Sequence, residues 1–342
     1  MIWAGELHLN QLSNKQSMCH THLNFFRPTI FHHYFYQKGS KHKVAFLLLS
    51  IFIFIKIVSA QPSPVIKILL VTAHPDDEAV CAATVYKITH DLKGIVDLAL
   101  ITNGEGGYNY STLAEDIYGL ELSTEEIGRA YLPAIRKQEL IAGGNIIGIR
   151  NYFFLDQRDH RYTKDVREIF EGVWDTDFVI ERLRYIIAHG NYDYLFTLLP
   201  TEETHGHHKG ATILALRAVS QIEIPNKPVI LGCTTADKDD QTTFVFKELD
   251  DYPITKINRE APIFTFDRTQ KFGYQDRLNY KIIVNWLIAE HKSQGTMQLA
   301  MNQGDYEKFW FFSINDNNKI KSTTSLFRRL EVNHFKKSEY GL

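Results

Sequence analysis

The chain has 342 residues, of which 44% are hydrophobic and 23% are charged. This composition is that of an ordinary globular protein with a sizeable core, organised as one large domain or two small ones. With 38 Lys and Arg against 40 Asp and Glu, the sequence has no basic excess, so nothing in it favours nucleic-acid binding. The three cysteines include no CxxC pair and favour neither a disulfide framework nor a thiolate zinc site.

Residues 1–60 have the character of a leader segment. A basic stretch at 41–43 (Lys-His-Lys) precedes an apolar run at 44–55, and small residues follow at 58–60 (Val-Ser-Ala). The run is short for a transmembrane helix and resembles the core of a secretory signal peptide. We therefore expect residues 61–342 to be a mature domain that is secreted or periplasmic, or membrane-anchored if the leader is retained. The unusual length of the leader also leaves open a mis-assigned start.

From residue 65 onward, apolar runs of strand length alternate with segments of helical periodicity. We expect strands at 66–72, 96–102, 151–155, 193–199 and 229–233, and helices at 78–92, 133–147, 177–189, 209–221 and 276–293. This alternation predicts an α/β fold with a Rossmann-like, mostly parallel sheet and helices on both faces, in three layers. Two later segments, 243–247 and 263–266, have the pattern of a hairpin, and the interval 108–131 is long enough to be a lid.

The first expected strand ends in a polar cluster, residues 74–78 (His-Pro-Asp-Asp-Glu). In open α/β sheets, ligands bind beyond the carboxyl ends of strands. His74 and Asp77 can offer a nitrogen and an oxygen to one metal ion, whereas Asp76 would face elsewhere and stay free to act as a base. Pro75 fits the first position of a helix. Alternatively, the acids only complement the positive end of that helix dipole.

A second polar cluster, residues 204–210, follows the fourth expected strand and contains His205, His207 and His208. Catalytic zinc usually has three protein ligands and a fourth position open to water. One of these histidines would complete a His/Asp/His set with the two residues after the first strand. The alternative is a solvated helix start with incidental histidines.

Together, these two clusters resemble those of the PIG-L/LmbE family of zinc-dependent sugar N-deacetylases. The resemblance covers about residues 65–312. It includes residues 100–104 (Leu-Ile-Thr-Asn-Gly), the pair Arg136 and Glu139, and residues 154–156 (Phe-Leu-Asp). Residues 291–294 (His-Lys-Ser-Gln) also resemble a segment near the C-terminus of family members, although a polar helix end explains that stretch equally well.

The resemblance implies a metal centre and a base at the first cluster. The zinc ligands of the family correspond to His74, Asp77 and His208, and its general base corresponds to Asp76. The implied cofactor is therefore Zn²⁺.

The resemblance also implies residues that act on the substrate. His205 corresponds to the histidine that assists at the oxyanion or at the leaving amine, and Arg136 and Asp156 correspond to substrate contacts. Family members often have an acid where this chain has His207, which leaves the orientation of His205 open.

From these residues we expect a hydrolase that uses zinc to remove the N-acetyl group from an N-acetylglucosamine-type amino sugar or glycoconjugate. Two alternatives remain at this stage. One is hydrolysis of another N-acyl amide, and the other is a carbohydrate-binding module that keeps the fold without turnover. The expected partner is the N-acetylated sugar, with membrane contact only if the leader is retained.

Overall fold

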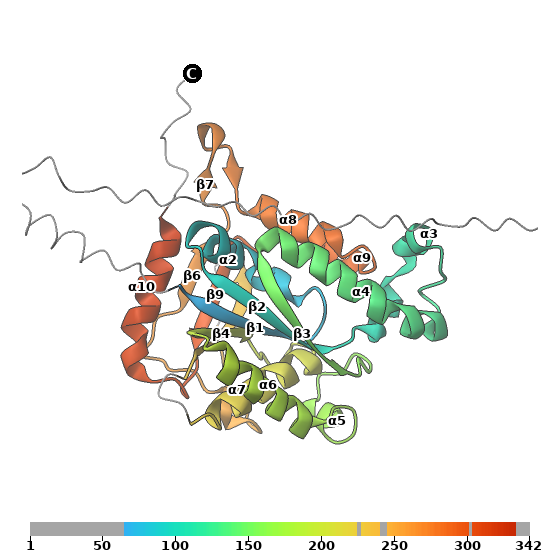
Figure 1. Ribbon diagram of the computed structural model, residues 1–342, viewed down its shortest axis with the longest axis horizontal. Coiled ribbons are helices and arrows are strands. Elements are labelled where there is room, and N and C mark those ends of the chain that lie inside the picture. The colour runs from blue at the N-terminus through green and yellow to red at the C-terminus, as the bar shows by residue number, and fades with distance from the viewer. Residues whose placement is uncertain (1–64, 224–226, 240–244, 301–302, 333–342) are drawn as a thin grey trace, which may run out of the picture. The chain divides into compact units, whose positions relative to one another are not determined.

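The computed structural model describes residues 65–223, 227–239, 245–300 and 303–332 (Figure 1). The expected leader lies outside these residues. None of the helices that the structure describes combines the length and the apolar character needed to cross a membrane.

A seven-stranded sheet runs through the centre of the described residues, in the order β3-β2-β1-β4-β5-β9-β6. Five of its strands are parallel: β1 (Lys67–Thr72), β2 (Ile95–Thr102), β3 (Ile149–Gln157), β4 (Tyr194–Leu198) and β5 (Val229–Ala236). Two more are added at one edge, where β9 (Tyr306–Phe311) is antiparallel to both β5 and β6 (Phe264–Asp267). A small separate ribbon pairs β7 (Lys271–Phe272) with β8 (Leu278–Asn279).

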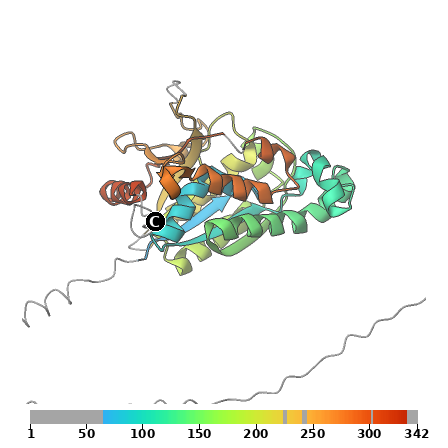
Figure 2. The same cartoon turned by 90° about the horizontal axis from the view of Figure 1, so that it is seen from above.

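Helices cover both faces of the sheet and enclose two apolar cores (Figure 1). One face carries α2 (Ala82–Tyr86), α4 (Glu125–Ile147), α8 (Lys281–Glu290) and α10 (Ile320–Glu331). The other face carries α5 (Val166–Phe170), α6 (Thr176–Gly190) and α7 (Gly206–Ser220). Figure 2 shows α4 and α8 side by side along the first face. The predicted three-layer α/β fold is confirmed.

Short helical turns fill several connections. These are η1 (Asp77–Cys81), η2 (Lys87–Asp91), η3 (Glu105–Tyr110), η4 (Thr112–Ala114), α3 (Glu115–Tyr118), η5 (Pro253–Thr255), η6 (Tyr274–Asp276), α9 (Gly295–Leu299) and η7 (Asn317–Lys319). The helix predicted at 78–92 is therefore a composite of η1, α2 and η2. The interval predicted as a lid is folded into η3, η4 and α3 and then enters α4.

The predicted elements differ from the structure most clearly in the last third. The predicted hairpin is wrong, because β6 pairs with β9, about 40 residues away in sequence, and residues 245–247 form no strand; residues 243–244 lie outside the described part. The helix predicted at 276–293 is confined to α8. The helix predicted at 133–147 begins eight residues earlier, at Glu125, where Glu125 and Glu126 suit the positive helix end and Pro133 is accommodated inside.

The sheet order places the turns after β1 and β4 next to each other. The chain builds outward from β1 to β3 on one side and from β4 to β5 on the other. The strand order reverses between β1 and β4, and such a switch point leaves a crevice at the carboxyl ends of the strands. Both polar clusters of the sequence follow these two strands, so the fold brings them together.

Candidate metal and active site

The turn after β1 is folded by the side chain of Asp77. Its Oδ2 atom accepts hydrogen bonds from the backbone N–H groups of Ala73 and His74, at 2.9 and 2.8 Å. The prediction that Pro75 opens a helix is wrong, because Pro75 lies in the turn and η1 begins only at Asp77. The turn holds Asp76 at a φ of 120°, a backbone conformation that residues with a side chain rarely adopt and that costs about 1–3 kcal/mol.

Buried partners on two sides hold Asp76 in this conformation. Its backbone N–H donates to Glu78 Oε2 at 2.9 Å, and its Oδ2 atom accepts from Arg136 Nη2 at 2.9 Å. Glu78 is in turn paired with His291, whose Nε2 atom lies 2.6 Å from Glu78 Oε1, and both side chains are fully buried. His291, the first residue of the His-Lys-Ser-Gln stretch, therefore stabilises the Asp76 turn through Glu78.

The three predicted metal ligands lie together beside this turn. His208 Nε2 is 3.2 Å from His74 Nδ1 and 3.1 Å from Asp77 Oδ1, and His74 Nδ1 is 3.8 Å from Asp77 Oδ2. A tetrahedral zinc ion with bonds of about 2.0–2.2 Å holds its ligand atoms about 3.3–3.6 Å apart. Two imidazoles and a carboxylate with this spacing form a candidate metal site.

The other ring nitrogen of His74 faces a second set of side chains. His74 Nε2 lies 2.9 Å from His207 Nδ1 and 3.6 Å from Asp159 Oδ1, and Asp159 Oδ1 lies 3.3 Å from His207 Nδ1. Histidines that bind a metal usually direct their second nitrogen to a carboxylate or carbonyl, which fixes the ring. Asp159 is placed to do this for His74.

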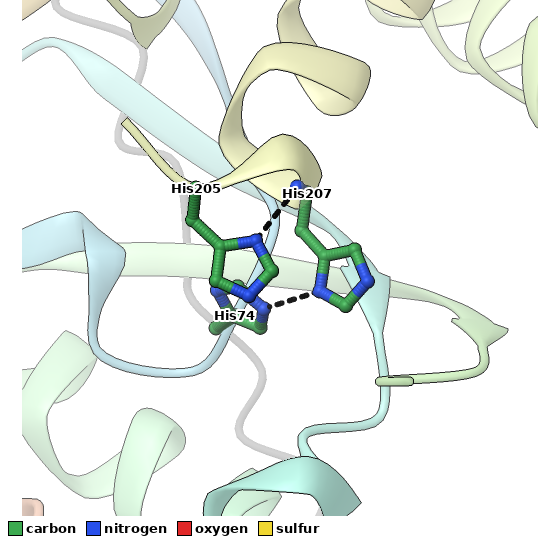
Figure 3. A group of neighbouring side chains, drawn as sticks. All are labelled: His74, His205 and His207. Carbon is green, nitrogen blue, oxygen red and sulfur yellow. Dashed lines mark hydrogen bonds between the residues drawn. The ribbon is translucent and has the colours of Figure 1, made fainter. Parts of the chain in front are cut away.

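A second group that could hold a metal shares His74 with His205 and His207 (Figure 3). Its three nitrogens lie within 4.8 Å of one another, but the group contains no carboxylate. The Nδ1 atom of His205 is also engaged, because it accepts a hydrogen bond from the backbone N–H of His207 at 2.9 Å. The set of His74, Asp77 and His208 therefore suits a divalent cation better.

The charges around the site favour a cation. Burial alone would raise the pKa values of Asp77 and Asp159, but His208 and His74 hold the pKa of Asp77 well below its usual range. His74 and His207 do the same for Asp159. Burial lowers the pKa of His74, and the opposing effect of Asp159 and Asp77 is larger and raises it to about 10. The field that favours a proton on His74 also favours a metal ion in its place.

His205 presents a hydrogen-bond donor to the pocket. Since its Nδ1 atom accepts the His207 N–H group, the neutral ring carries its proton on Nε2 (Figure 3). Burial and the neighbouring imidazoles of His74, His207 and His208 lower its pKa to about 2, so the ring is neutral at physiological pH. The edge of the ring packs on Tyr162, with ring centroids 4.9 Å apart.

A pocket of about 240 Å³ opens over these groups. His74, Asp76, Asp77, His205 and His208 lie in its wall together with residues from η3, α4, the loop after β3 and the 294–297 stretch: Gly106, Gly107, Tyr108, Asn109, Tyr110, Arg136, Asp159, His160, Arg161, Tyr162, Gln294, Thr296 and Met297. Aromatic rings and hydrogen-bonding groups of this kind suit a sugar ring. Burial raises the pKa of Asp76 to about 6, an effect that Arg136 opposes.

The two predicted substrate contacts differ in placement. Arg136 is in the pocket wall but is 2% exposed, and its guanidinium already donates to Asp76, to the Pro75 carbonyl at 2.7 Å and to the Gly104 carbonyl at 2.8 Å. Asp156 does not belong to the pocket wall. It is exposed, has a φ of 52° and pairs with Lys137. Arg136 therefore contacts Asp76, whereas Asp156 lies outside the pocket wall.

Three features of the site were not found from the sequence. Asp159 carried no signal, because it lies in the loop beyond the expected strand. Glu78 belongs to the first polar cluster, but the sequence gives it no role beyond complementing the helix dipole. The stretch 291–294 was noticed without a role, and the structure ties it to the site at two further points: Ser293 bonds Glu139 through both its N–H and its hydroxyl, and Gln294 donates to the Gly107 carbonyl at 3.2 Å.

The part of the chain that contains both polar clusters is similar to proteins of a known family. Residues 69–219 match the family model described as "PIG-L: GlcNAc-PI de-N-acetylase". Over these residues the chain is similar to the PIG-L family. This match includes the candidate metal ligands, Asp76, His205, Arg136 and Asp159.

A curated relative and two solved structures are also similar. The relative is a probable N-acetyl-alpha-D-glucosaminyl L-malate deacetylase 2 of Bacillus cereus, 29% identical over 163 residues that make up 48% of this chain and 65% of the relative. This chain thus matches slightly less than two thirds of the length of that protein. The N,N'-diacetylchitobiose deacetylase of Pyrococcus horikoshii has a TM-score of 0.45 and 16% identity, with 81% of this chain and 94% of that chain covered. A deacetylase of the A40926 pseudoaglycone has a TM-score of 0.46 and 16% identity, with 72% and 96% covered.

Proposed function

We propose that this protein is a zinc-dependent hydrolase that removes the N-acetyl group from an N-acetylglucosamine-type amino sugar or glycoconjugate. The observation that carries the proposal is the placement of Asp76. Its carboxylate lies in the pocket wall beside the metal ligands and belongs to neither candidate metal group. A site that only bound a sugar or held a structural metal would have no use for a buried, strained acid at that position.

The residues of the site have different roles in amide hydrolysis. His74, Asp77 and His208 would hold the zinc ion, which when bound lowers the pKa of a coordinated water to about 7 and polarises the amide carbonyl. Asp76 acts as the general base that accepts a proton from the attacking water. His205 donates from Nε2 to the oxygen that becomes negative, a contact worth roughly 3–4 kcal/mol for one well-placed donor.

The leaving amine needs a proton, and Asp76 is the better source. His205 is neutral, and its low pKa makes an imidazolium costly. Asp76 has just received a proton, and burial has brought its pKa to about 6, near the range in which a carboxyl both accepts and returns a proton. Asp76 therefore serves as base and then as acid.

The substrate proposal draws on the pocket and on the relatives. Tyr108, Tyr110 and Tyr162 in its wall suit a sugar ring, and the family description and the Bacillus cereus relative both name N-acetylglucosamine compounds. The decisive experiment is amine release from N-acetylglucosamine, its oligomers and its glycoconjugates, with purified protein before and after chelation. Release that is lost on chelation and restored by zinc supports the proposal. Amine release that is indifferent to metal, or absent from every substrate, would refute it.

We also propose that the protein is exported and that the mature chain begins near Gln61. The support is the order of a basic stretch, a short apolar run and the small residues Val58, Ser59 and Ala60. N-terminal sequencing of the native protein tests this. An intact leader on protein from a cytoplasmic fraction would contradict it.

A further inference from the structure

A second cavity, of about 200 Å³, adjoins the first at the acidic turn. Asp76, Asp77 and Met297 line both cavities, so the two meet where the turn after β1 faces α9. None of the histidines or tyrosines of the first pocket lines the second one. Its apolar wall comes from η1, β4, α8 and the end of α9: Ala79, Val80, Leu198, Ile288 and Ala300.

Apart from Asp76 and Asp77 at the junction with the first pocket, the polar groups of this second cavity are Thr235, Gln303 and Arg268. Arg268 is 3% exposed, and its charge is paired with Glu307, with Arg268 Nε 2.8 Å from Glu307 Oε1. Its Nη2 atom donates to the Ala79 carbonyl at 2.6 Å. Because this guanidinium is already paired and bonded, the cavity is better suited to an apolar group than to an anion.

The two parts of a bound amide substrate extend from the reaction centre in different directions. The amine side carries the sugar, which fits the polar, tyrosine-lined pocket. The acyl side starts at the carbonyl carbon beside Asp76 and Asp77, which is where the apolar cavity begins. A methyl group would occupy only its mouth, since about 200 Å³ holds roughly six groups of about 30 Å³ each.

We propose that this cavity is an acyl-chain subsite and that the protein hydrolyses N-acyl amino sugars with chains of about four to six carbons better than the N-acetyl compound. The inference rests on the proposed function and deepens it, because it names the acyl group. Each methylene that leaves water for an apolar wall contributes about 0.8 kcal/mol, which corresponds to roughly a fourfold gain. For two added methylenes we expect kcat/KM to rise roughly fifteenfold.

The experiment compares N-acetyl-, N-butyryl- and N-hexanoylglucosamine, with free amine as the readout, in the zinc-loaded full chain. Two variants, Ala300→Phe and Val80→Phe, place a ring in the cavity from different walls. Leu299→Phe is the matched control, since Leu299 is next to Ala300, is 79% exposed and lies in neither wall. We expect both filling variants to lower the butyryl-to-acetyl ratio of kcat/KM about fifteenfold and the control to leave it unchanged.

Several outcomes would overturn the subsite. Rates that fall steadily from acetyl to hexanoyl in the wild type would do so. Filling variants that slow the acetyl substrate as much as the butyryl one would instead indicate an exit path for acetate or general damage. If no substrate is hydrolysed, the proposed function fails, and the subsite is tested separately by calorimetry on Asp76→Asn protein. Equal affinity for the three compounds there would reject it, and tighter binding of the longer chains would support it.

Discussion

Asp76 and Asp77 follow β1, and Asp156 and Asp159 lie at the end of β3 and just beyond it, and the structure uses the two pairs in different ways. After β1, Asp76 and Asp77 are both buried and both reach the pocket. Near the end of β3, Asp156 is exposed and pairs with Lys137, whereas Asp159, three residues later in the following loop, is buried between His74 and His207. The position of an acid after a strand therefore does not decide its role. The backbone of the turn decides it, through the direction that it gives each carboxylate.

The sharpest test of the first turn separates its two adjacent acids. Asp77→Asn should weaken the metal site, so we expect both bound zinc and activity to be lost. Asp76→Asn removes only the ability to accept a proton, so bound zinc should stay near wild type while kcat falls roughly 10²–10⁴-fold. Metal analysis, melting temperature and kcat of the two proteins decide the matter. If Asp76→Asn keeps wild-type turnover, the proposed mechanism is wrong, even if the zinc site is right.

The second comparison sets Asp159 against Asp156. Asp159→Asn keeps the shape but removes the charge that steadies His74, and such changes beyond the ligands typically cost 10–100-fold in metal affinity or activity. Asp156→Asn should leave metal and turnover unchanged, because its partner is a surface lysine. The measurements are zinc affinity by competition with a chelator and kcat/KM. Equal effects of the two substitutions would mean that Asp156 contacts the substrate after all.

Much of this arrangement could be predicted from the sequence, because it depends on local patterns. His74 and Asp77 come directly after a buried strand, and His208 follows another, so the parallel fold alone places them at one edge of the sheet. The five parallel strands were recognisable as short apolar runs for the same reason.

The remainder depends on contacts between distant segments. Asp159 is turned inward because its Oδ2 atom accepts the Gly106 N–H at 3.1 Å and its own N–H donates to Glu105 Oε2 at 3.0 Å. Asp156 is turned outward by its positive φ, beside a register shift between β2 and β3. Neither turn has a signal in the sequence nearby. The pairing of β6 with β9 was missed for the same reason.

A third comparison uses Arg136 and Lys137, which are neighbours on α4. Arg136 pairs with Asp76, and Lys137 pairs with Asp156. The proposed base, Asp76, can accept a proton only when it is ionised, so activity should fall as the pH drops through its pKa. Burial raises that pKa to about 6 and Arg136 opposes the rise, so Arg136→Gln should raise it further, by about one unit or more. We expect the acid limb of kcat/KM to move to higher pH and activity at pH 7 to fall up to about tenfold.

The matched control for that shift is Lys137→Gln, which should leave the pH profile in place. If Arg136→Gln instead raises KM and leaves the acid limb unmoved, Arg136 binds substrate as the sequence suggested. Thermal melts of both proteins at the assay pH exclude loss of fold as the cause.

The smallest effect is expected from the surface pair itself. The side chains of Lys137 and Asp156 are 24% and 59% exposed, and ion pairs in such surroundings contribute about 0.2–1 kcal/mol, less at high salt. The φ of 52° at Asp156 is a conformation that Asn also tolerates, so Asp156→Asn adds no backbone strain. A double-mutant cycle of Lys137→Gln and Asp156→Asn should therefore give a coupling energy below about 1 kcal/mol, with melting temperatures lowered by at most about 3 °C. A coupling of several kcal/mol that is insensitive to salt would show that the Lys137–Asp156 pair behaves like the buried Arg136–Asp76 pair, contrary to its exposure.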